Sequence, residues 1–203
     1  MSKFNFNERS MMSNSVSPVF NAGVAGKVEE VKVEVNKRRA DEPDSYPAYK
    51  LTFTDNTGNS VNQGFYYFTP KQGYSDEQND KLSGYLIDRV LETANAVVPE
   101  GFVYPEIPET GDNVKDTNVA LDTLFKVIKD NSDDAKVNVF VTYGTKQKPS
   151  KYLSLRYFNY VEKAGKIGYS PLKEKGDDLM QRVVEDSPRE EQSTTTTTSG
   201  PAW

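Results

Sequence analysis

The sequence predicts a mixed α+β domain, mostly β, in which five strands form a small barrel that carries a two-helix insertion. Three observations predict this fold: five short segments alternate apolar and polar residues, two segments between them have apolar residues at helical spacing, and both chain ends lack either pattern. A chain of 203 residues fits one domain with tails. We expect a flexible N-terminal arm over 1–17, the domain over 18–170 and an acidic disordered tail over 171–203.

The first part of the domain has the pattern of three strands. Valines partly alternate with polar residues over 28–36, and a second alternating run covers 49–54. Residues 55–58, Asp-Asn-Thr-Gly, are a strong hairpin signal, because glycine adopts a positive φ without steric cost. The return strand is expected over 61–68.

Two amphipathic helices are expected next, as an insertion over about 75–131. Ser75 is followed three residues later by Gln78, with acidic residues between them, which is the pattern of a capped helix start. This helix should end before Pro99. A second apolar stripe at helical spacing predicts a helix from about residue 116 to residue 129.

Two further strands, over 137–143 and 152–160, form a second expected hairpin. Successive side chains of a strand point to opposite faces. That alternation places four residues of the last strand on one face: Tyr152, Arg156, Phe158 and Tyr160.

Charge is segregated along the chain. The whole chain has a net charge of −5, but residues 135–175 contain nine Lys or Arg and two Glu. The helical insertion and the tail carry the surplus acid. Because exposed charges are screened beyond roughly 10 Å at physiological salt, phosphate binding requires a local positive field and not a positive average. The acidic balance therefore does not exclude a nucleic-acid partner.

The composition lowers the expectation of an enzyme. The chain has no Cys and no His, so it has no Cys nucleophile and lacks the commonest general base and the commonest metal ligand. Asp130, Asp133 and Asp134 superficially resemble a metal loop but lack the spacing of a calcium loop. We expect no catalytic residue, no cofactor and no metal. No apolar run has the length of a membrane span, and we expect a protein of the cytoplasm.

A basic and aromatic surface on the last two strands is the best candidate for a functional site. In a five-stranded oligonucleotide-binding barrel, aromatic rings stack on bases while basic residues follow the phosphates. The alternative is that these rings pack under the two helices. The candidate nucleic-acid-binding residues are Lys146, Lys148, Lys151, Tyr152, Arg156, Phe158, Tyr160, Phe140, Tyr66 and Phe68.

The chain resembles the phage-type single-stranded DNA-binding proteins. The resemblance lies in the hairpin AYKLTFTDNTGNSVNQGFYYF, the hairpin VNVFVTYGTKQKPSKYLSLRYFNYVE and an acidic tail that ends in an aromatic residue. It implies an oligonucleotide-binding (OB) fold that coats and protects single-stranded DNA during phage replication or recombination. It also implies a tail that recruits replication or recombination proteins through Trp203, Glu190 and Glu191. Removal of residues 176–203 is then expected to leave the fold intact.

A phage virion structural or assembly protein is the alternative function. In that case the aromatic hairpins form a subunit interface, and the flexible ends link neighbouring subunits. Salt-sensitive binding to an oligonucleotide separates the two hypotheses, because counterion release requires that phosphates are neutralised.

Overall fold

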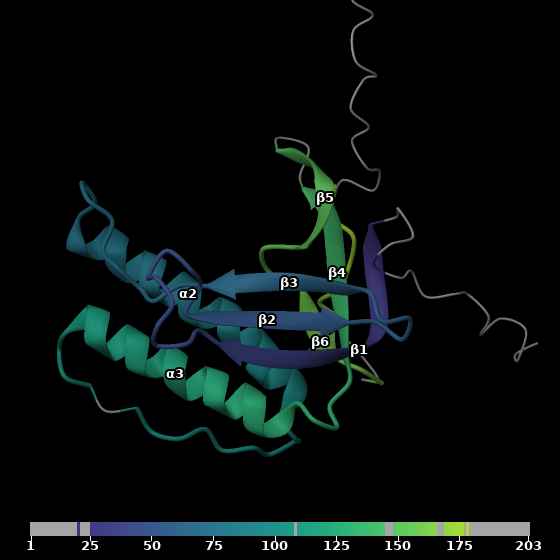
Figure 1. Cartoon of the computed structure of the whole chain (residues 1–203), viewed down its shortest axis with the longest axis horizontal. Coiled ribbons are helices and arrows are strands. Elements are labelled where there is room, and N and C mark those ends of the chain that lie inside the picture. Colours follow the sequence, from purple (N-terminus) through teal and green to yellow (C-terminus); the bar gives the residue numbers. More distant parts are fainter. Residues whose placement is uncertain are drawn as a thin grey trace, which may run out of the picture.

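The computed structural model describes residues 20, 25–107, 109–144, 148–165, 169–176 and 178. The expected N-terminal arm lies outside these residues, as do Lys146, Glu190, Glu191 and Trp203. The described part is a mixed α+β fold in which two helices pack against one sheet (Figure 1). Its elements are β1 (Gly26–Lys37), β2 (Tyr49–Thr54), β3 (Ser60–Phe65), α2 (Asp76–Val97), α3 (Asn113–Asn131), β4 (Val137–Gly144), β5 (Pro149–Leu155) and β6 (Val161–Lys163).

The sheet has six strands, and every pair in it is antiparallel. The strand order is β3-β2-β1-β4-β5. Strand β5 pairs with residues 141–144 of β4, and β6 pairs with residues 137–139 of the same strand. The two expected hairpins are present: β2 and β3 join across the predicted 55–58 turn, and β4 and β5 form the second. Strand β6 was not predicted.

Strand β1 bends and so belongs to both halves of the sheet. Its first part pairs with β4 and its second part pairs with β2. The register with β4 shifts between Val28 and Val31, where Glu30 has a φ of 55° and its N–H donates to Asn138 Oδ1 at 3.3 Å. Such a bulge increases the local twist of a strand. Figure 1 shows the result, with β2 and β3 running across the direction of β4 and β5.

The expected five-stranded barrel is not closed, because the sheet stays open between β3 and β5. Among the described residues, β3 pairs only with β2, and β5 pairs only with β4. The β4–β5 pairing is short and irregular, with a register shift between Thr142 and Gly144. The two edge strands nevertheless approach each other. The Arg89 side chain of α2 contacts β3 and the segment that follows β5.

The helix ends follow from local hydrogen bonds. The predicted cap of α2 is confirmed: Ser75 Oγ accepts the N–H of Gln78, and the Gln78 side chain accepts the N–H of Ser75. Helix α3 begins three residues earlier than expected, because the Asp112 carboxylate accepts the N–H groups of Val114 and Lys115.

The core lies between the two helices and the inner face of the sheet. Phe125 of α3 stacks on Tyr49 of β2 with ring centroids 4.1 Å apart, and it meets Phe65 of β3 edge-on at 5.3 Å. Full burial of a large apolar side chain stabilises a fold by about 1.5–3 kcal/mol. Other fully buried members are Leu51, Phe53, Val90, Leu121, Ile128, Val137 and Val139.

Asp55 fixes the start of the described domain. Its buried carboxylate accepts the N–H groups of Phe20, Thr57 and Asn59 and the hydroxyl of Thr57. Burial alone would raise the pKa of Asp55, but the hydrogen bonds outweigh it and hold that pKa below its usual value of 3.8.

We expect Asp55→Ala to lower the free energy of unfolding by about 2–3 kcal/mol, because it leaves several donors without their acceptor. Since the pKa is lower in the folded state, the carboxylate stabilises the fold above pH 4, and this contribution is lost as the pH falls through the folded pKa. Urea unfolding of the wild-type and Ala proteins between pH 3 and pH 7 measures it. A stability difference that grows towards acid pH would contradict this assignment.

Candidate nucleic-acid interface

Four of the predicted binding residues lie in the interior. Tyr160 is 0% exposed, and Phe140, Phe68 and Arg156 are between 3% and 8% exposed. A buried ring cannot stack on a base in this conformation. The alternative interpretation, that the rings pack under the two helices, agrees with the position of Tyr160, whose hydroxyl contacts Arg89 and Thr93 of α2. The Phe140 ring lies instead against Arg156.

Tyr160 turns inward because β5 ends at Leu155, five residues before it. The chain then bends at 157–159, where Asn159 has a φ of 50°, and the alternation of a continuous strand no longer applies. The half-buried Glu92 carboxylate, whose pKa is raised by partial burial, stabilises this bend by accepting the N–H groups of Asn159 and Tyr160. The Tyr160 hydroxyl donates to the Arg89 carbonyl at 2.8 Å.

Arg156 binds a C-terminal segment that packs against the sheet. Its guanidinium lies 4.0 Å from the Phe140 ring centroid, donates to the carbonyl of Lys173 at 2.6 Å and pairs with Asp178 at 3.2 Å. Both charged side chains are buried, at 8% and 5% exposed. Leu172 is also buried. Residues beyond position 171, where the sequence predicts the tail to start, thus contact the domain: Leu172, Lys173 and Asp178.

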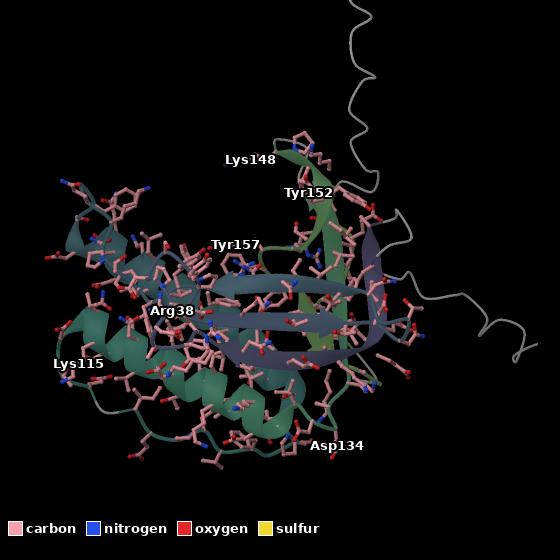
Figure 2. All side chains as sticks on the ribbon, viewed as in Figure 1. Arg38, Lys115, Asp134, Lys148, Tyr152 and Tyr157 are labelled. Carbon is pink, nitrogen blue, oxygen red and sulfur yellow. The ribbon has the colours of Figure 1, made fainter. Side chains whose placement is uncertain are left out.

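Other predicted residues are accessible. On the β4–β5 hairpin Tyr152 is 67% exposed, Lys148 is exposed and Lys151 is half-buried, with its Nζ 5.5 Å from the Tyr152 ring centroid. Figures 1 and 2 show that this hairpin projects from the body of the domain, with Lys148 at its end. Tyr66, which follows β3, is 53% exposed, and Phe158 is half-buried.

Sequence reasoning missed two exposed rings that complete this surface. Tyr157 is 56% exposed and meets Phe158 edge-on at 4.5 Å. Tyr85 of α2 is 50% exposed, and its ring lies 6.0 Å from that of Phe158. A tyrosine outside the apolar stripe of α2 was the available signal for Tyr85. The name aromatic surface is used below for Tyr66, Tyr85, Tyr157 and Phe158.

Arg89 joins the two open edges of the sheet and lies beside the aromatic surface. Its Nη2 donates to Gln63 Oε1 of β3 at 2.7 Å, and its guanidinium carbon lies 4.4 Å from the centroid of Tyr157, which follows β5. A helix side chain thus contacts both β3 and the segment that follows β5. Figure 2 shows Tyr157 between α2, β3 and the β5 hairpin.

The charge of Arg89 is incompletely balanced. Within the described part of the chain no carboxylate lies within 4.0 Å of its guanidinium, and its buried Nε has no hydrogen-bond partner. Burial lowers the pKa of Arg89, although nearby tyrosines and Glu92 oppose that shift. A partly buried cation beside exposed rings is suited to an anionic ligand with a flat face.

The described residues contain neither a membrane-spanning helix nor a cluster of metal ligands. Neither α2 nor α3 has the length and apolar character needed to cross a lipid bilayer. No group of three or more acidic side chains in the described ranges is placed to hold a metal ion. The Asp130 carboxylate instead pairs with Lys126.

No family of known proteins, no curated protein and no solved structure matches this chain. Its function is therefore argued from its own residues and their geometry.

Proposed function

We propose that the protein binds single-stranded DNA along the aromatic surface and the β4–β5 hairpin, in the role of a phage replication or recombination protein. The observation that carries this proposal is the group of exposed rings between α2, β3 and β5, with cations beside them. Unpaired bases stack on exposed aromatic rings with little dependence on sequence, and neighbouring cations neutralise the phosphates.

The topology supports the same proposal. An oligonucleotide-binding barrel is a five-stranded, partly open barrel that binds through its second and third strands and through the loops that follow its first and fourth strands. Here β1 to β5 stand in an order in which β3 and β5 are the open edges. Lys148 lies at the end of the β4–β5 hairpin, and Tyr152 lies further along β5 (Figure 2). We therefore propose an OB-like fold that is held open by Arg89.

The proposed surface also has a composition that protein interfaces favour, since tyrosine and arginine are enriched there. The virion or assembly alternative thus remains an outcome of the test. A subunit interface would give self-association without a preference for single strands.

Salt dependence is the sharpest test of the proposed function. Five cations are candidates for phosphate contacts. Lys71, Arg89, Lys148 and Lys151 lie among the described residues, and Lys146 precedes Lys148 by two positions in the sequence. If they neutralise about five phosphates, log K should fall with log salt with a slope near −3.5, at ~0.7 per phosphate for single strands. Raising salt from 50 to 200 mM should then weaken binding roughly a hundredfold. Fluorescence anisotropy of a labelled 20-nucleotide strand measures this dependence.

Matched controls make that titration specific. Lys148→Gln should reduce the slope by ~0.7, whereas Lys126→Gln on α3 should leave the slope unchanged. A duplex of the same sequence should bind more weakly than the single strand, because its bases are already stacked. A flat salt response, or equal affinity for duplex, would overturn the proposed function.

A further inference from the structure

A second feature beside Arg89 is a cavity between the end of β3 and α2. Its volume is about 400 Å³, within the range of small-ligand sites. Leu82 and Leu86 of α2 and Phe65 of β3 supply apolar wall, and Tyr66 supplies an exposed ring. The cavity is thus large enough for a small molecule and has one flat aromatic side.

Two cations line the same cavity without an acidic partner. Lys71 and Arg89 both lie in its wall, and in the part of the chain that the structure describes neither forms an ion pair within 4.0 Å. The Lys71 Nζ instead donates to the Tyr74 hydroxyl at 2.9 Å and lies 4.4 Å from that ring's centroid. Arg89 is partly buried and Lys71 is exposed, and two cations beside one cavity with no carboxylate partner among the described residues favour the binding of an anion.

The two halves of the cavity wall therefore differ in chemistry. An inorganic anion would use the cations but would leave the apolar wall in contact with water. An apolar ligand would leave the cations unsatisfied. A nucleotide satisfies both, because it combines a phosphate with a flat ring that can stack.

We propose that this cavity holds a single nucleotide, with the base against Tyr66 and Leu86 and the phosphate at Lys71 and Arg89. The proposal rests on the proposed function and deepens it. Arg89 also contacts Tyr157 of the aromatic surface, so the cavity adjoins that surface through Arg89. One base of the bound strand is then held apart from the stack of its neighbours.

Binding of dTMP, thymidine and inorganic phosphate to the isotope-labelled full chain by NMR tests the cavity itself. We expect dTMP to shift backbone signals around β3 and the start of α2, and to bind at least fivefold more tightly than thymidine or phosphate. Equal affinity for phosphate and dTMP would mean an anion site only. Absence of any dTMP-induced shift in this region would overturn the nucleotide pocket.

Variants link the cavity to strand binding. Tyr66→Ala and Lys71→Gln change exposed side chains, and each should weaken both dTMP and a 20-nucleotide strand roughly 5- to 100-fold. Tyr46→Ala, an exposed ring in the β1–β2 loop, is the control and should change neither. Circular dichroism melts establish that each variant is folded.

The two proposals fail separately. If Tyr66→Ala and Lys71→Gln bind dTMP as the wild type does, the pocket is overturned, and strand binding at Tyr157 and the β4–β5 hairpin decides the proposed function separately. Binding of dTMP without binding of any strand would support the pocket and overturn the proposed function.

Discussion

Replacing Tyr160 by alanine is expected to lower the free energy of unfolding by about 3–5 kcal/mol, the usual effect of truncating a large buried ring. The side chain is fully buried and packs edge-on against Phe53, with ring centroids 6.3 Å apart. Its hydroxyl lies 2.6 Å from Thr93 Oγ1 and donates to the Arg89 carbonyl. The truncation therefore removes packing and takes away the Tyr160 partner of the buried Thr93 hydroxyl.

Tyr157→Ala is the matched variant, because the two rings are three residues apart and differ in exposure. Tyr157 is 56% exposed, and its removal should change stability little while it weakens strand binding by about 1–3 kcal/mol. Guanidinium unfolding and anisotropy on the same samples separate the two effects. A Tyr160→Ala protein with near wild-type stability and a selective loss of DNA binding would restore Tyr160 to the binding surface. Tyr160→Phe, which keeps the ring, should bind DNA as the wild type does.

These two tyrosines also show what the sequence can and cannot predict. Both helices, the first hairpin and its Asp55–Gly58 turn were predicted because each has a local signal: a cap, an apolar period or a glycine at a positive φ. The end of β5 has no comparable signal. Asn159 adopts a left-handed φ that asparagine only sometimes takes, and Glu92, distant in sequence, stabilises it. A tertiary contact thus decides which face Tyr160 occupies.

The candidate site is also only partly predictable, because local patterns indicate some of its residues and tertiary contacts decide the position of the others. Tyr66, Tyr152, Phe158, Lys148 and Lys151 remain accessible, as expected for a basic and aromatic hairpin. Charge counting over 135–175 could not distinguish a solvent-exposed cation from Arg156, which balances a buried acid. Charge counting also could not find Arg89, because that residue lies in the acidic helical segment. Only the folded structure brings Arg89 beside Tyr157 and Gln63.

The buried Arg156–Asp178 pair leads to the second large expected effect. A chain that ends after Lys175 should be less stable by about 3–5 kcal/mol than a chain that ends after Arg182, because loss of one partner leaves a buried charge uncompensated. Because Asp178 lies in the removed segment, we now expect removal of residues 176–203 to destabilise the fold, in contrast to the expectation from the sequence.

Asp178→Ala in the full chain isolates the ion pair from the rest of the truncated segment. It should reproduce most of the loss, because Arg156 keeps only the carbonyls of Lys173 and Asn159 and the Phe140 ring as partners. Urea unfolding of the three proteins gives the comparison. Equal stability of the two truncated chains would show that Arg156 reaches solvent easily when its acid is removed. That result would make Arg156 accessible to a phosphate and would return it to the DNA-binding surface.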